Sequence, residues 1–216
     1  MDPTDDFDEE AQQRGYRLVA GLDEAGRGPL AGPVVAAAVI LPRRFRLAGL
    51  NDSKQVSESE RERLYEEIAE RAVRFGIGCA SEQEIDAMNI LEATRLAMDR
   101  AIQAIVPPPD FLLIDAVTLP GVSLPQRSII KGDGLCLSIA AASILAKVSR
   151  DRLMREYHRR YPQYNFLAHK GYGTAEHLRL LAHYGPCEIH RRTFRPVLRA
   201  CAQRSEITFF SFKGEG

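Results

Sequence analysis

The chain has 216 residues, 45% of them hydrophobic, and its 29 basic and 29 acidic residues leave no net charge. This length and hydrophobic content favour a single domain with a full core. The sequence has no run of roughly 18 uncharged apolar residues, which a membrane helix needs, and its N-terminus is too acidic for a signal or transit peptide. Composition therefore argues against a membrane protein, and we expect a soluble, cytoplasmic monomer.

Charge is spread unevenly along the chain. Residues 1–120 hold 13 basic and 22 acidic residues, whereas residues 121–200 hold 14 basic and 5 acidic residues. A basic half of this kind can follow a polyanion such as a nucleic-acid backbone, although a solvated basic helix face explains it equally well. The 4 cysteines are far apart and form no C-x-x-C pair, which indicates reduced packing residues rather than a zinc or redox site.

The predicted elements begin after an acidic segment, residues 1–15, which we expect to be a disordered tail. Ser57 with Glu60, and Ser81 with Glu84, have the spacing of helix-starting capping boxes. Apolar periodicity and turn residues predict, in chain order, strands over 17–23 and 34–41, a helix over 57–74, a strand over 75–80, one or two helices over 81–105, strands over 111–117 and 126–131, and helices over 138–161 and 175–184. This order predicts an α/β domain with a mixed sheet covered on both faces.

Acidic residues follow three of the predicted apolar strands. Asp23 and Glu24 follow the first strand, Asp115 ends the run 111–114, and Asp133 follows a later run through Lys131 and Gly132. Adjacent carboxylates at the end of a buried strand repel each other and are costly to desolvate, so a fold that keeps them usually has a cation for them to bind. Oxygen ligands of this kind suit Mg²⁺ or Mn²⁺ rather than Zn²⁺.

A glycine-rich turn follows the first acidic pair. Residues 26–31 formally fit the dinucleotide-binding pattern G-x-G-x-x-A. That pattern must open a helix, whereas Gly32 and Pro33 lead into a predicted strand, and the preceding acids would repel a phosphate. We interpret the turn instead as glycines that let backbone amides approach a ligand, with Arg27 beside them.

These motifs resemble the ribonuclease HII family, the type-2 ribonucleases H. The resemblance starts with Leu-Asp-Glu-Ala-Gly-Arg-Gly-Pro at 22–29 and covers about residues 17–198. Its further blocks, in family order, are 52–54, 114–115, 131–133, 138–151, 169–174 and 190–197. It implies a ribonuclease H-like mixed sheet flanked by helices with a helical C-terminal part, a catalytic domain over 16–198 and a tail over 199–216. Arg27, where the related ribonuclease HIII usually has Lys, and the short segment before the first strand favour HII.

The resemblance also implies roles for individual residues. It implies that Asp23, Glu24, Asp115 and Asp133 are catalytic and bind two Mn²⁺ or Mg²⁺ ions. The segment Gly26, Arg27 and Gly28 matches the loop that recognises the ribonucleotide sugar, and Tyr172 matches the aromatic residue that packs on the following deoxyribose. Lys54, Ser143 and Lys147 fall in blocks that resemble phosphate-contacting regions. Residues 134–136 depart from the family, which favours Ala and small polar residues after the last carboxylate.

The implied activity is that of an endoribonuclease. It would hydrolyse the RNA strand of RNA/DNA hybrids and cut 5′ of ribonucleotides embedded in duplex DNA, leaving 3′-hydroxyl and 5′-phosphate ends. Two alternatives stay open: a noncatalytic duplex-binding module stabilised by a cation, and another two-metal nuclease of the same fold that acts on DNA. Cleavage assays on all-DNA, hybrid and single-ribonucleotide duplexes separate the three.

Two further segments allow more than one interpretation. Asp151 is a further candidate carboxylate for the site, but on an arginine-rich helix such a residue is more often a surface ion-pair partner. Residues 203–210 resemble a sliding-clamp peptide, except that Glu206 stands where that motif has Ile, Leu or Met. A tail that folds back on the domain or forms a short edge strand explains these residues better.

Overall fold

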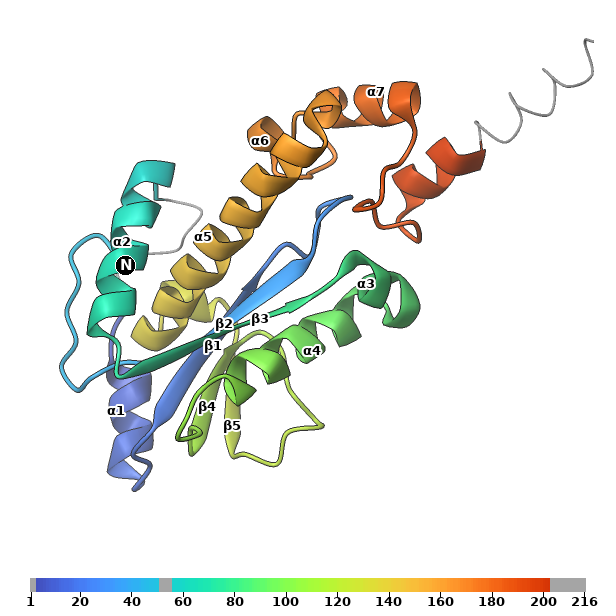
Figure 1. Ribbon diagram of the computed structural model, residues 1–216. Coiled ribbons are helices and arrows are strands. Elements are labelled where there is room, and N and C mark those ends of the chain that lie inside the picture. The colour runs from blue at the N-terminus through green and yellow to red at the C-terminus, as the bar shows by residue number, and fades with distance from the viewer. Residues whose placement is uncertain (1–2, 51–55, 203–216) are drawn as a thin grey trace, which may run out of the picture.

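The computed structural model describes residues 3–50 and 56–202 as a layered α/β fold (Figure 1). The elements in chain order are α1 (Asp6–Gln13), β1 (Val19–Ala25), β2 (Val34–Ile40), α2 (Glu58–Arg71), β3 (Arg74–Ala80), α3 (Glu82–Met88), α4 (Ile90–Gln103), β4 (Phe111–Asp115), β5 (Gln126–Ile129), η1 (Gly132–Gly134), α5 (Leu137–Arg160), η2 (Pro162–Tyr164), α6 (Phe166–His169) and α7 (Ala175–Tyr184). No helix among these residues is long and apolar enough to cross a membrane.

The sheet is mixed, as the sequence predicts. Its strand order is β3-β2-β1-β4-β5, with β1–β2 and β2–β3 antiparallel and β1–β4 and β4–β5 parallel. Leu22 of β1 lies opposite Ile114 of β4. Because these two strands run parallel, Asp23 and Asp115, one residue further along, reach the same edge of the sheet.

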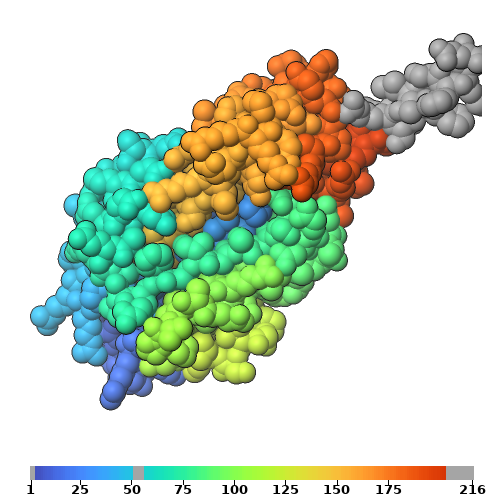
Figure 2. Space-filling view, in the orientation of Figure 1, coloured from blue at the N-terminus to red at the C-terminus, as the bar shows by residue number. Residues whose placement is uncertain are grey.

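The two faces of the sheet are covered by different helices (Figure 1). Alternate residues of a strand point to opposite faces. On β1, Ala20 and Leu22 pack with α4, whereas β2 residues such as Ala37 and Val39 pack with α5 and α2. In the space-filling view, a strip of the N-terminal strands (blue) lies between the gold α5 and the green α3 and α4 (Figure 2).

Helix α5 approaches β1 closely because the residues at the contact are small. A Cβ added at Gly21 would lie 2.2 Å from the carbonyl carbon of Ser138, so only glycine fits there. The alanines at 140–142 are fully buried on the helix side. The close approach brings Ser143 and Lys147, further along α5, to the end of β1 that carries the acidic pair.

The N-terminal segment is not disordered over its described residues, which corrects the expectation for 1–15. Helix α1 buries Ala11 against a cluster that includes Val19 and Phe111. Thr4 forms a parallel bridge with Cys136, because its N–H donates to Leu135 (3.0 Å) and its carbonyl accepts from Leu137 (2.8 Å). The acidic composition hid these anchoring contacts.

The C-terminal boundary at 199 is also too early. Residues 195–202 are helical, and Val197 and Ala200 are buried in a cluster with Leu30 and Leu181. The packed domain therefore extends through residue 202. The candidate clamp peptide at 203–210 lies outside the described residues.

The element ends show how well local sequence signals work. Ser81 and Glu84 form the complete capping box, but at Ser57 only half of it forms, since the Glu60 side chain pairs with Arg63. The segment 81–105 contains two helices, α3 and α4, which are separated at Asn89, where φ is +79°.

The uneven charge distribution is partly explained by ion pairs between helices. Arg152 and Arg155 of α5 pair with Glu62 of α2, so bases of the second half neutralise acids of the first half. Arg150 and Arg191 are fully buried rather than on a basic surface. All 4 cysteines are described residues, and none of them forms a disulfide.

Candidate active site

Most of the candidate residues line one cavity of about 220 Å³ at the end of β1 and β4. The lining residues are Asp23, Glu24, Ala25, Gly26, Arg27, Gly28, Asp115, Ser143, Lys147 and Tyr172. They come from four parts of the chain: β1 with its following turn, the end of β4, helix α5 and the loop before α7. Of the described candidates, Asp133 and Asp151 are not lining residues, and Lys54 lies outside the described residues.

Asp23 is the most deeply buried carboxylate of the cavity. Its Oδ1 accepts a hydrogen bond from the Glu24 backbone N–H at 2.7 Å. Burial raises the pKa of Asp23 well above its usual range, the nearby charges of Glu24 and Asp115 raise it further, and a hydrogen bond from Ser143 lowers it. Asp23 is therefore repelled by the charges of both Glu24 and Asp115, and a cation between the carboxylates would relieve this repulsion.

Asp115 is tied to the segment that carries Asp133. The Gly132 N–H donates to Asp115 Oδ1 at 2.7 Å, and Asp133 follows in η1 with 7% of its surface exposed. Ala116, directly after Asp115, has φ of +48°, a strained backbone for a residue with a side chain. The structure therefore places the Asp133 segment beside Asp115, although Asp133 is not a lining residue of the cavity.

The donor set fits a hard divalent cation by its chemistry, because it consists of carboxylate oxygens. Within residues 3–50 and 56–202, no three acidic, His or Cys side chains are arranged closely enough to hold an ion as they stand. Asp23, Glu24 and Asp115 nonetheless line the same cavity, so side-chain rotation can bring their oxygens toward a shared ion.

The glycine turn lies against two buried arginines, Arg150 and Arg191, which belong to the basic half of the chain. Gly26 has φ of +98°, and a Cβ there would lie 2.1 Å from Arg150 Nε. Arg150 donates to the carbonyls of Ala31, Pro33 and Lys170, each at 3.0 Å. Arg191 donates to the carbonyls of Gly26, Arg27 and Gly32 at 2.6, 3.0 and 2.9 Å. No local pattern in the sequence marks these arginines as buried.

Arg27 and Tyr172 stand at the rim of the cavity. Arg27 pairs with Glu24 at 3.2 Å, and its side chain is 43% exposed. Tyr172 is 45% exposed, as its glycine neighbours suggest. A Cβ at Gly28 would lie 3.8 Å from the Tyr172 ring, so the glycine turn and the aromatic ring are adjacent.

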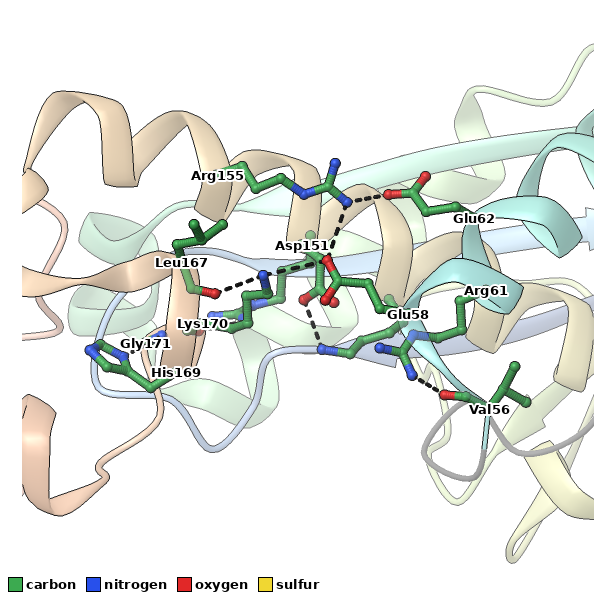
Figure 3. Close-up of polar contacts among 12 residues, drawn as sticks. Val56, Glu58, Arg61, Glu62, Asp151, Arg155, Leu167, His169, Lys170 and Gly171 are labelled. Carbon is green, nitrogen blue, oxygen red and sulfur yellow. Dashed lines mark hydrogen bonds and ion pairs between the residues drawn. The ribbon is translucent and has the colours of Figure 1, made fainter.

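The loop that carries Tyr172 is anchored on both sides. Lys170 donates to the carbonyl of Leu167 at 2.9 Å and lies 3.7 Å from Glu58 at the start of α2 (Figure 3). The Gly171 N–H donates to His169 (3.2 Å), and the Gly171 carbonyl accepts from the Leu30 N–H (2.8 Å). The contacts with Glu58 and Leu30 join segments that are far apart in the sequence, so no local pattern marks them.

Lys147 and Asp151 form an ion pair next to the cavity. The Lys147 Nζ lies 2.7 Å from Asp151 Oδ1, and Asp151 is only 2% exposed, so the expected surface ion pair is a buried one. Burial lowers the pKa of Lys147, while the bond to Asp151 raises it. The ion pair with Asp151 therefore holds the Lys147 side chain in its position at the cavity.

Comparison with known proteins identifies relatives of this chain. The family model described as ribonuclease HII matches residues 20–197. The ribonuclease HII of Syntrophotalea carbinolica is 55% identical over 191 residues, which cover 88% of this chain and 91% of that protein.

Solved structures of similar fold include ribonuclease H2 from Pyrococcus horikoshii OT3, with a TM-score of 0.72, 25% identity, and 85% of this chain and 97% of that chain covered. The PCNA:RNase HII complex from Archaeoglobus fulgidus aligns with a TM-score of 0.69 and 26% identity over 83% of this chain and 96% of that one. Bst-RNase HIII in complex with Mn²⁺ aligns with a TM-score of 0.69 and 20% identity over 89% of this chain and 71% of that one, and so matches in fold. The chain belongs to the ribonuclease HII family and is an endoribonuclease of the ribonuclease H type.

Proposed function

We propose that this enzyme hydrolyses the RNA strand of RNA/DNA hybrids and cuts on the 5′ side of a ribonucleotide embedded in duplex DNA, leaving 3′-hydroxyl and 5′-phosphate ends. The observation that supports this most is the shared cavity, which three acidic side chains, Asp23, Glu24 and Asp115, line together with Gly26–Gly28 and Tyr172. In this cavity, carboxylates that suit metal-dependent phosphodiester hydrolysis lie beside a glycine turn and an aromatic ring that suit binding of a sugar.

We propose that Asp23, Glu24, Asp115 and Asp133 hold two divalent ions, Mn²⁺ or Mg²⁺. Such ions, when bound, activate water and neutralise charge on the phosphate and the leaving oxygen. Burial, together with repulsion from Glu24 and Asp115, raises the pKa of Asp23, which supports this assignment because deprotonated carboxylates gathered in a buried site need positive charge nearby. Asp133 would join them from the segment that the Gly132 N–H ties to Asp115.

The remaining cavity residues would bind and orient the nucleic acid. Backbone amides of Gly26–Gly28 can reach a 2′-hydroxyl, the group by which RNA differs from DNA at one nucleotide. Tyr172 would pack on the next sugar, and Lys147 would face a phosphate as its ion pair with Asp151 holds it in place. Lys54 and Ser143 complete the proposed phosphate contacts, with Ser143 also hydrogen-bonded to Asp23.

Cleavage of three matched duplexes with Mn²⁺ or Mg²⁺ tests the proposal. The wild type should cut the hybrid and the single-ribonucleotide duplex and leave the all-DNA duplex intact. Asp115→Asn should abolish cleavage while duplex binding persists, and Asp99→Asn, an acid-to-amide change on α4 outside the cavity, should keep full activity. Cutting of pure DNA would favour the DNA nuclease, and binding without any turnover would favour the noncatalytic module.

We further propose that the enzyme is cytoplasmic and monomeric. Light scattering of the purified protein tests whether it is a monomer. A sliding-clamp contact, suggested by the Archaeoglobus complex and by residues 203–210, stays a weaker prediction because Glu206 interrupts the motif. Loss of clamp binding on deletion of residues 203–212 would support it. Unchanged binding after the deletion, or no clamp binding by the full chain, would reject it.

A further inference from the structure

We propose that Arg191 is a positioning residue for ribose recognition: its buried guanidinium holds the carbonyls of Gly26 and Arg27 inward and so turns the amides of Arg27 and Gly28 toward the cavity. This inference rests on the proposed function, because it concerns how the glycine turn reads the 2′-hydroxyl.

The first support is the contact geometry of Arg191. The residue is 0% exposed and comes from a segment more than 160 positions along the chain from the turn. All three guanidinium nitrogens donate to backbone carbonyls: Nη2 to Gly26 (2.6 Å), Nη1 to Arg27 (3.0 Å) and Nε to Gly32 (2.9 Å). The planar guanidinium therefore fixes two consecutive peptide units at once.

The second support is the geometry of those peptides. In a trans peptide, the C=O of one residue and the N–H of the next point in opposite directions. With the Gly26 carbonyl on Arg191, the Arg27 N–H points away from it, and the Arg27 carbonyl orients the Gly28 N–H in the same way. Neither amide donates a hydrogen bond to a backbone carbonyl in the described part of the chain. Arg27 and Gly28 line the cavity and Arg191 does not, so both donors face the ligand side.

The third support is electrostatic. Burial, and then the charge of nearby Arg150, lower the pKa of Arg191 to about 9, which still leaves the guanidinium protonated at neutral pH. Two buried guanidiniums side by side are unfavourable unless they are well bonded, and here six backbone carbonyls accept from them. Glu82, 5% exposed, contributes the attractive buried charge. Buried charges are costly to desolvate, and we take their presence behind this turn as a sign that the arginines orient its backbone.

Removing Arg191 would leave the buried Gly26 carbonyl and the part-buried Arg27 carbonyl without this partner. The peptides would then rotate to find one, and the two amides would lose their common direction. Because one or two neutral hydrogen bonds to the 2′-hydroxyl would be lost, the preference for ribose over deoxyribose should fall about tenfold.

The test measures that preference directly. In an Asp115→Asn background with Mg²⁺, fluorescence anisotropy gives the dissociation constants of two duplexes that differ by one 2′-hydroxyl. Their ratio is compared with Arg191 present, with Arg191→Lys and with Arg191→Ala, and melting temperatures are recorded for every protein. Met98→Ala, a fully buried site on α4 away from the turn, is the matched destabilised control.

The inference predicts a ratio about tenfold smaller in Arg191→Ala, a smaller loss in Arg191→Lys, and recovery when guanidinium ion is added to Arg191→Ala, with Met98→Ala unchanged. An unchanged ratio in a folded Arg191 variant, with only a lower melting temperature, would mean that Arg191 is purely structural. If Arg191→Ala does not fold, Arg191→Lys decides alone. If the parent protein itself shows no preference while the duplexes bind, the proposed function fails first, which is a distinct result.

Discussion

At the residue scale, the glycine turn shows how one missing side chain permits a buried charge to approach the backbone. Gly26 combines a positive φ of +98° with Arg150 Nε at 2.1 Å from the position a Cβ would take. Both features exclude any other residue there without movement of the turn. Arg150 can lie directly behind the turn only because glycine leaves that space open.

We therefore expect Gly26→Ala to abolish cleavage of a single-ribonucleotide duplex and to lower stability by about 1–3 kcal/mol, as forced backbone strain does. Urea unfolding and a cleavage assay measure the two effects. Gly121→Ala is the matched control, since a Cβ there meets nothing within 4 Å. Equal behaviour of the two variants would mean that the turn can move without loss of function.

The candidate carboxylates could be located from the sequence, whereas the arginines behind the turn could not. Asp23, Glu24 and Asp115 follow apolar runs, and a parallel sheet brings such strand ends together, so local pattern suffices. Arg150 and Arg191 are buried by contacts with segments more than 100 residues away. Their burial depends on tertiary packing, and single-residue propensity places arginine on the surface.

At the scale of elements, helix α1 is the clearest difference between expectation and structure. It is short and acidic, and its stability comes from packing rather than from helix propensity. Asp8 shows the cost of that docking, since burial raises the pKa of its carboxyl to about 6, with bonds to Ser138 and Cys136 opposing the rise. Thr4, the residue bridged to Cys136, links α1 to the segment that carries Asp133. Capped elements such as α3 and α7 are predictable because their signals are local.

We expect Ala11→Asp to undock α1 and destabilise the protein by about 2–4 kcal/mol, because it places a charge at a site that is 3% exposed and near Asp8. Activity should fall along with stability, since the Asp133 segment loses its support. Thermal melts and cleavage rates measure both effects. Gln13→Asp, on the exposed side of the same helix, should change neither, and a comparable loss there would show that α1 responds to charge in general rather than to burial.

At the scale of the whole molecule, a chain of buried histidines connects the C-terminal segment to the Tyr172 loop. The Cys187 N–H donates to His190 Nδ1 (3.0 Å), the two Nε2 atoms of His190 and His177 lie 3.1 Å apart, and His177 Nδ1 lies 2.9 Å from the Tyr172 carbonyl. One assignment satisfies every contact: His190 is protonated on Nε2 and His177 on Nδ1, and both rings are neutral. Parts far apart in the sequence thus hold the rim of the cavity together.

These hydrogen-bonded histidines should make the stability of the enzyme sensitive to acid. Burial lowers the pKa of His177 to about 4, and burial together with His177 lowers that of His190 to about 3. In the unfolded protein both rings take up protons near pH 6.5, so the stability present above that pH is lost as the pH falls toward 4. Two such rings reduce the free energy of unfolding by about 2 kcal/mol per pH unit between pH 6 and 5. Urea unfolding at closely spaced pH values measures this slope, to which other groups such as Asp8 and Asp23 also contribute.

The informative quantity is therefore the difference in slope between variants. His190→Asn should flatten the slope by about half of the histidine contribution, whereas His183→Asn, at an exposed position, should leave it unchanged. Equal slopes in the two variants would mean that His190 takes up its proton as readily in the folded protein as in the unfolded one, and the neutral chain that anchors Tyr172 would then not exist.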